Sequence, residues 1–302
     1  MRRWIAVLAA AVGLVAVPGV ARAELPVPYS LAGGFFANPT AALNPNAPPP
    51  GSNDWRCAPS AAHPRPVVLL HGLGANQGLN WSTMSPVLKN AGYCVFSLTY
   101  GAHWWLPSVG GLRSMRESAA SLDAFVERVR AATGADEVDL VGHSQGSTVA
   151  AYYLKRLGGA DVVGTLVGLS PNYAGTSLYG LTHLADNLPP LLNAVLEGVC
   201  ASCKEYYPGS AFMKDLNAGG SAAVAGVRYV NVQGLVEQVV LPNSSGTLPG
   251  AENTRVSDGC ALDLSDHISI VSSRRAARTM LNALDPGSAE PLPCAFNPPF
   301  LS

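Results

Sequence analysis

The pentapeptide GHSQG at residues 142–146 constrains the fold of this chain more than any other feature. An apolar run at 138–141 precedes it, and a run with helical spacing follows it at 147–157. A strand that passes through G-x-S-x-G into a helix turns so sharply that the serine needs small neighbours, which Gly142 and Gly146 supply. The pattern predicts a strand, a tight turn and a helix, with Ser144 standing alone at the carboxyl end of a sheet.

Strand-like and helix-like segments alternate along the rest of the chain. Apolar runs with little polar alternation suit strands that are buried on both faces of a parallel sheet, and they lie at 66–70, 93–98, 138–141, 162–169 and 227–232. Spaced apolar positions predict helices at 82–91, 115–132, 146–157 and 272–284. This alternation predicts the α/β class with a mostly parallel, doubly wound sheet.

Residues 170–217 interrupt the alternation. The segment is long, lies between two predicted strands and contains an apolar cluster at 188–192. Segments of this length between strands usually form a small structure of their own above a site, so we expect a helical cap or lid. Ordinary helices packed on the core are the alternative.

Residues 1–23 have the pattern of a secretory signal peptide. Arg2 and Arg3 precede an apolar stretch at 4–17, and Ala21 and Ala23 frame a small-x-small cleavage pattern. The stretch is shorter than the about 20 residues of a membrane-spanning helix. We therefore expect secretion and a mature chain without a transmembrane segment, with a retained anchor as the alternative. A Pro-rich N-terminal arm is expected at 24–65 and the main domain at 66–302.

Cysteine content agrees with export. Six cysteines behind a signal peptide favour three disulfides, and the sequence alone does not choose among the possible pairings. Cys200 and Cys203 form a C-x-x-C pair with no second such pair and no strand-then-helix context. We interpret it as a small local disulfide, in preference to a redox motif or half of a zinc site.

A serine nucleophile needs a histidine to accept its proton and a carboxylate to orient that histidine. Around a G-x-S-x-G turn the chain order is serine, acid, histidine, and two histidines follow Ser144. His183 lies in the expected lid, whereas His267 lies after the last predicted strand and before the final helix, where the base belongs. Glu237 follows the strand at 227–232 and is the predicted acid, with Asp258 as the alternative.

The oxyanion of an acyl-transfer reaction needs two backbone N–H donors. One is the amide of the residue after the nucleophile, Gln145, and the other comes from the loop after an early strand. That loop reads His-Gly-Leu-Gly at 71–74, so Leu73 is the predicted donor. The same glycines resemble a dinucleotide-binding loop, but the spacing differs by one residue and no acidic residue follows at the required distance.

Three segments together carry a family resemblance: VVLLHGLGANQGLNWSTMSPVLKNAGYCVFSLTYG, DLVGHSQGSTVAAYYLKRLGG and GCALDLSDHISI. With them the chain resembles the secreted bacterial class 2 triacylglycerol lipase family, from about Pro66 to Pro286. The resemblance implies the α/β-hydrolase fold and an ester hydrolase that acts on lipid or other hydrophobic acyl esters.

The resemblance also implies roles for individual residues. Ser144 and His267 match the catalytic serine and histidine, and Leu73 and Gln145 match the oxyanion donors. Where the family usually has Asp-Glu-Val-Val, this chain reads EQVV at 237–240, so Glu237 stands in place of the usual Asp. The disulfide pairs implied by the resemblance are Cys57–Cys94, Cys200–Cys203 and Cys260–Cys294.

These observations predict a lipase or carboxylesterase that cleaves hydrophobic esters such as acylglycerols through an acyl-enzyme, without a metal or organic cofactor. A secreted acyltransferase on the same scaffold is the alternative within enzymes, and a catalytically inactive binding protein is the alternative outside them. The net charge of −1 and the absence of a basic patch in the mature sequence indicate no nucleic-acid partner. We expect a monomer whose partner is a hydrophobic ester or a lipid–water interface.

Overall fold

The sheet has six parallel strands in the order β2-β1-β3-β4-β5-β6. The computed structural model describes residues 23–300 apart from 38, 41–43, 45 and 178–188, so the predicted signal peptide lies outside the described residues except for Ala23. The strands are β1 (Val67–Leu70), β2 (Val95–Leu98), β3 (Val138–His143), β4 (Val163–Leu169), β5 (Arg228–Gln233) and β6 (Glu252–Arg255). The predicted α/β class with a parallel, doubly wound sheet is confirmed.

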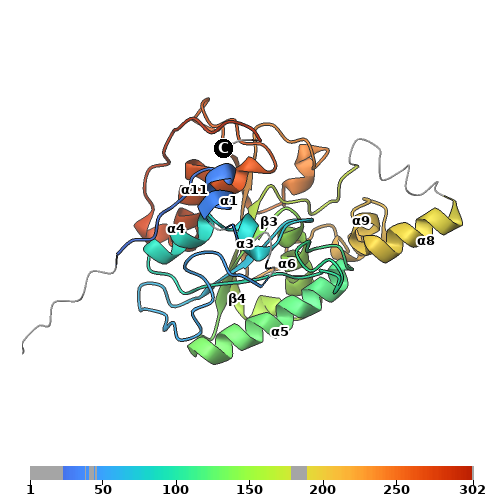
Figure 1. Ribbon diagram of the computed structural model, residues 1–302, viewed down its shortest axis with the longest axis horizontal. Helices are drawn as coiled ribbons and strands as arrows, with labels where there is room; N and C mark the ends of the chain where they lie inside the picture. The colour runs from blue at the N-terminus through green and yellow to red at the C-terminus, as the bar shows by residue number, and fades with distance from the viewer. Residues whose placement is uncertain (1–22, 38, 41–43, 45, 178–188, 301–302) are drawn as a thin grey trace, which may run out of the picture.

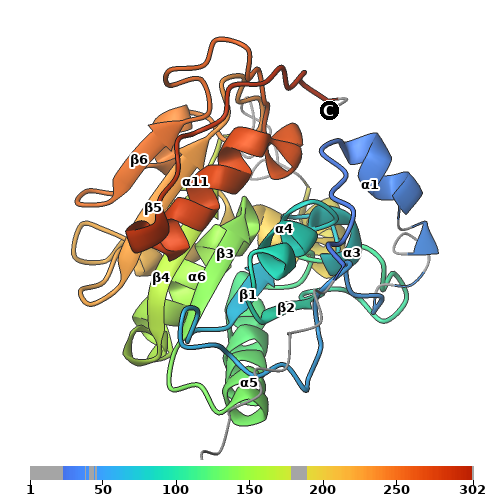
Figure 2. The same cartoon turned by 90° about the vertical axis from the view of Figure 1, so that its left-hand side faces the viewer.

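Helices cover both faces of this sheet (Figure 1, Figure 2). Val68 and Leu70 pack into one core with α5 (Met115–Thr133) and α6 (Gln145–Arg156), whereas Val67 and Leu69 pack into a second core with α4 (Met84–Asn90) and α11 (Arg274–Leu284). Because successive side chains of a strand point to opposite faces, β1 must be apolar throughout. Short 3-10 turns complete the fold: η1 (Gly159–Asp161), η3 (Asn243–Gly246), η4 (Ser269–Ser272) and η5 (Pro286–Ser288).

Local signals set the ends of the long helix α5. The Ser114 side chain accepts a hydrogen bond from the Arg116 amide at its start, and Gly134 ends it with φ of 71°. Serine suits the first position because its oxygen satisfies an otherwise unpaired amide. Glycine suits the last because a positive φ costs it little.

Two elements differ from the sequence-based expectation. The strand β6 was not predicted, because its residues are polar and mostly exposed at the edge of the sheet. The N-terminal segment contains the helix α1 (Leu31–Ala37), whose sequence LAGGFFA has two glycines and no charged residue. Neither element carries the apolar periodicity on which the predictions depended.

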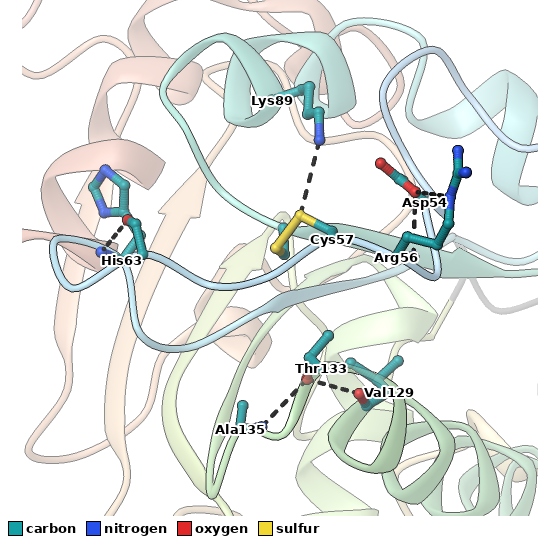
Figure 3. The surroundings of a disulfide bond; sticks show 10 residues. Asp54, Arg56, Cys57, His63, Lys89, Val129, Thr133 and Ala135 are labelled. Atoms are coloured by element: carbon teal, nitrogen blue, oxygen red, sulfur yellow. Dashed lines mark hydrogen bonds and ion pairs between the residues drawn. A yellow bond between two sulfur atoms is a disulfide. The ribbon is translucent and has the colours of Figure 1, made fainter. Parts of the chain in front are cut away.

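The described part of residues 24–65 contacts the main domain at several points. The Leu25 amide donates to Asn90 Oδ1 at 2.8 Å, and Asn90 Nδ2 donates back to the Leu25 carbonyl at 2.9 Å. The Asn53 amide donates to the Val95 carbonyl at 2.9 Å, beside the start of β2. A disulfide joins Cys57 to Cys94, and Figure 3 shows Lys89 directed toward the Cys57 sulfur at 3.9 Å.

The other two disulfides join Cys200 to Cys203 and Cys260 to Cys294. These are the pairs that the family resemblance implies. The first closes a local turn between two helices. The second ties the loop that follows β6 to the C-terminal segment.

Between β4 and β5 the described chain forms α8 (Pro190–Val199), α9 (Ala201–Glu205) and α10 (Ala211–Leu216). The helix α10 buries Phe212, Met213 and Leu216, whereas α8 buries none of its residues. Figure 1 shows α8 projecting from the body of the molecule. In the part of the chain that the structure describes, no helix is both long enough and apolar enough to cross a membrane.

Candidate active site

Ser144 occupies the sharp turn between β3 and α6. The strand β3 lies inside the sheet, between β1 and β4 (Figure 2). Its φ of 50° and ψ of −118° are strained for a residue with a side chain. A Cβ on Gly142 would lie 2.4 Å from the Ser147 nitrogen, and one on Gly146 would lie 2.1 Å from the Leu70 carbonyl oxygen. Both positions therefore require glycine, as the pentapeptide predicts.

His267 lies in the loop before η4, and its Nε2 is 2.8 Å from Ser144 Oγ. Asp266 stabilises this loop, since its Oδ1 accepts the Ser269 amide at 2.7 Å and the Ile268 amide at 3.2 Å. Burial alone would raise the pKa of Asp266, but the hydrogen bonds from Ser269 and Gln238 lower it. His183, the other histidine that follows Ser144, lies outside the described residues.

Glu237 lies on the other side of the imidazole. Its two carboxylate oxygens are 2.9 Å and 3.1 Å from His267 Nδ1, and its side chain is only 3% exposed. Burial would raise the pKa of Glu237, but the hydrogen bond and charge of His267 and the amides of Val239 and Val240 lower it below its ordinary value. The group is therefore an ionised acceptor that can stabilise a proton on the ring.

Asp258, the alternative acid, has a different environment. It is exposed, and its Oδ2 accepts the Arg255 amide at 2.8 Å within its own turn. The geometry thus pairs Glu237, and not Asp258, with His267. The extra methylene of a glutamate is accommodated because the Val239 and Val240 amides, both at 3.0 Å, hold its Oε1.

The predicted oxyanion donors belong to two elements: Leu73 lies in the loop after β1, and Gln145 is the first residue of α6, directly after Ser144. Among the described residues, neither backbone amide donates to another backbone carbonyl. Gln145 is fixed by its buried side chain, which donates to the Gly111 carbonyl at 2.9 Å. A Cβ on Gly111 would lie 2.1 Å from that side chain and 3.2 Å from the Leu73 Cα, so only glycine fits between the two.

Sequence reasoning missed the side chains that support these groups. His71 is fully buried, stacks on Tyr100 at 4.2 Å and accepts the Tyr100 amide at its Nε2. Its Nδ1 lies 2.8 Å from the Gly72 carbonyl, which can only accept, so Nδ1 carries the proton. Burial lowers the pKa of His71 to about 4, which keeps the ring neutral. Tyr100 lies 29 residues away, and no local pattern relates the two.

His143, next to the nucleophile, does not contact the serine hydroxyl. Its Nδ1 is 2.8 Å from Asn80 Oδ1, and its Nε2 is 2.8 Å from the main-chain carbonyl of His267. Burial, followed by the nearby charge of His267, lowers the pKa of His143 to about 3. No group of three or more His, Cys, Asp or Glu side chains able to hold a metal occurs within the described ranges.

This site can be compared with known proteins. The family model for lipase (class 2) matches residues 64–272, which is more than half of the 302-residue chain. The chain belongs to the class 2 lipase family. The family resemblance found in the sequence is thereby confirmed.

Solved lipase structures have the same fold. Lipase B from Aspergillus fumigatus is 18% identical with a TM-score of 0.61, over 82% of this chain and 57% of that chain. The mature form of Bacillus licheniformis lipase BlEst2 is 18% identical with a TM-score of 0.57, over 75% of this chain and 94% of that chain. This lipase family member thus spans little more than half of the Aspergillus protein. At this identity the likeness extends to the α/β-hydrolase fold alone.

Proposed function

We propose that the protein is a secreted serine ester hydrolase that cleaves hydrophobic carboxylic esters such as acylglycerols. The observation that carries the proposal is the continuous chain of hydrogen bonds from Ser144 Oγ through His267 to Glu237. Nucleophile, base and orienting acid are all within hydrogen-bonding distance, which is the geometry that acyl transfer through a serine requires. Membership of the class 2 lipase family supports the same reaction class.

The proposed reaction begins when His267 Nε2 accepts the hydroxyl proton of Ser144 while Oγ bonds to the ester carbonyl carbon. The carbonyl electrons move to oxygen, where the amides of Leu73 and Gln145 stabilise the negative charge. The tetrahedral intermediate then expels the alcohol, which takes the proton from His267. Water, deprotonated by His267, attacks the acyl-enzyme, and the acid leaves as Ser144 regains its proton.

Glu237 acts on the histidine in this scheme. Its depressed pKa keeps the carboxylate ionised across the neutral range, so the imidazolium formed in each half-reaction has a buried counter-charge. The oxygen atoms on Nδ1 also hold the ring in the tautomer that leaves Nε2 free to accept a proton.

The preference for hydrophobic esters rests on α8, the exposed helix of the region between β4 and β5 for which the sequence predicts a cap. In α8 the side chains of Leu191, Leu192 and Val195 are 75%, 52% and 55% exposed, although all three are apolar. An apolar helix with no fully buried residue suits contact with acyl chains or a lipid surface. Secretion is supported by the signal-peptide pattern together with three disulfides.

Two measurements test the proposal. A fluorophosphonate probe should label the oxidised protein at Ser144, and the Ser144→Ala variant should not be labelled. Rates on p-nitrophenyl esters of increasing chain length should then rise with acyl length, with a jump above the solubility limit if the cap acts at an interface. Absence of labelling in folded, oxidised protein would contradict the hydrolase assignment, and a preference for acetyl esters would contradict the substrate class.

A further inference from the structure

The main chain of His267 is contacted at both of its polar atoms by side chains from distant parts of the chain, one on a loop and one at the end of β3. Its amide donates to Gln238 Oε1 at 3.3 Å, and its carbonyl lies 2.8 Å from His143 Nε2. Gln238 directly follows the acid Glu237, and His143 directly precedes Ser144. Each of the other two members of the site therefore has a neighbour in sequence that binds the histidine backbone.

The Gln238 contact is extended by a second bond. Gln238 Nε2 donates to Asp266 Oδ2 at 2.7 Å, so one amide side chain binds two consecutive residues of the histidine loop. Backbone pairing joins the same two loops, because the Leu235 amide donates to the Ser265 carbonyl at 2.8 Å. The amide matches its surroundings, with oxygen facing an N–H and nitrogen facing a carboxylate.

The His143 contact requires one particular tautomer. A main-chain carbonyl can only accept, so Nε2 must carry the proton, and burial keeps the ring uncharged by lowering its pKa to about 3. Nδ1 then accepts, and Asn80 must present its NH2 group to it. In the described part of the chain this nitrogen otherwise has no partner. A half-turn of the Asn80 side-chain amide brings Nδ2 to His143 Nδ1. The same turn removes the hydrogen bond of 3.1 Å that Oδ1 accepts from the Gly72 amide.

We propose that Gln238 and His143 are positioning residues that fix the backbone of His267, and with it the ring, between Ser144 and Glu237. The proposal rests on the proposed function, since it concerns the base of that reaction. A ring held at 2.8 Å from the nucleophile and 2.9 Å from the acid tolerates little displacement, and misplacement by about 1 Å can lower a rate about 100-fold.

The test uses Gln238→Met and His143→Leu, which keep side-chain bulk and remove the hydrogen bonds, and His143→Gln, which restores a donor near the position of Nε2. Tyr173→Phe is the matched control, because it removes the buried hydroxyl that lies 3.0 Å from Asn231 Oδ1 and leaves the hydrogen bonds to the backbone of His267 in place. Rates on a short soluble ester are divided by the concentration of sites titrated with a fluorophosphonate. Unfolded protein is thereby excluded from kcat.

We expect kcat per titrated site to fall about 10- to 30-fold in Gln238→Met and His143→Leu, with KM within about 2-fold. His143→Gln should recover most of the loss, and Tyr173→Phe should match the wild type. Unchanged kcat per site in both apolar variants, or equal losses in His143→Leu and His143→Gln, would overturn the proposal. If His143→Leu does not fold, Gln238→Met alone decides: a fall in kcat per site supports the proposal, and an unchanged kcat per site overturns it.

A second readout is independent of turnover. Nitrogen-15 NMR of the histidine side chains should show His143 protonated at Nε2 in the wild type, and a ring protonated at Nδ1 would also overturn the proposal. An inactive wild type with an Nε2-protonated His143 would contradict the proposed function while leaving the backbone contacts in place. The two failures can therefore be distinguished.

Discussion

The surroundings of Ser144 and the helix α8 differ in how far their side chains are buried and how many hydrogen bonds fix them. Ser144 and His267 are each 5% exposed and bound by hydrogen bonds from several loops, whereas in α8 Leu191 is 75% exposed and no residue is buried. The first region is preorganised for one geometry, as bond-making chemistry requires. The second offers an exposed apolar surface whose side chains are not fixed by burial in the core. The proposed function thus assigns chemistry and substrate recognition to regions with different physical constraints, and it predicts that each can be altered separately.

The largest effect is expected from the nucleophile. Ser144→Ala should lower kcat by at least about 10⁴-fold, because attack through an acyl-enzyme is lost while the oxyanion donors remain. The midpoint of thermal unfolding should change little, since the variant keeps the glycines that permit the turn. Residual activity above about 1% of wild type on a soluble ester would contradict the role of Ser144.

The acid should come next. Glu237→Gln should lower kcat by about 10³- to 10⁴-fold, because an amide neither stabilises the imidazolium nor enforces its tautomer. Asp258→Asn is the matched control and should keep full activity, as Asp258 is exposed and bound within its own turn. Near-full activity in Glu237→Gln with a loss in Asp258→Asn would transfer the role to Asp258.

A smaller effect concerns the stability of the buried region as pH falls. The pKa of His71 is lowered to about 4, so below about pH 6.5 the unfolded chain binds more protons than the folded one. The contribution of His71 to the free energy of unfolding is therefore fully present above about pH 6.5. It decreases by up to about 1.4 kcal/mol per pH unit as the pH falls toward 4. Urea unfolding at several pH values should give a shallower slope for His71→Gln, and an unchanged slope would count against a buried neutral His71.

The smallest effect is expected at α8, and it should depend on the substrate. The double variant Leu191→Ser, Val195→Ser should lower rates on long-chain emulsions several-fold, because each replaced side chain removes exposed apolar contact surface. Rates on short soluble esters and the unfolding midpoint should stay unchanged. Leu157→Ser, which replaces an apolar residue 39% exposed just after α6, is the control. Equal losses on both substrates would contradict the separation of the two regions.

Much of the sheet and of the site could be predicted from the sequence. Strands buried on both faces have continuous apolar runs, and all five such runs became strands, whereas the polar edge strand β6 has no such signal. Ser144 is marked by its glycines, His267 by its order in the chain, and Glu237 by following a strand. Neighbouring residues and chain order are signals that a sequence carries directly.

The supporting contacts could not be predicted in the same way. His143 meets Asn80, 63 residues away, and the carbonyl of His267, 124 residues away. Gln145 meets Gly111, 34 residues away. Each of these contacts depends on how the loops fold over the carboxyl ends of the strands, and nothing in the neighbouring residues indicates the partner.

The most direct measurement is a rapid-mixing experiment with a p-nitrophenyl ester, followed by acid quenching and peptide mass analysis. Because p-nitrophenolate leaves readily, acylation should be faster than deacylation, so a serine acyl-enzyme predicts a burst of one p-nitrophenol per active site and an acyl group on the peptide that contains Ser144. The burst and the acyl mass should both be absent from Ser144→Ala. Turnover without a burst and without acylated Ser144, or an acyl group on another residue of the active protein, would contradict the assignment.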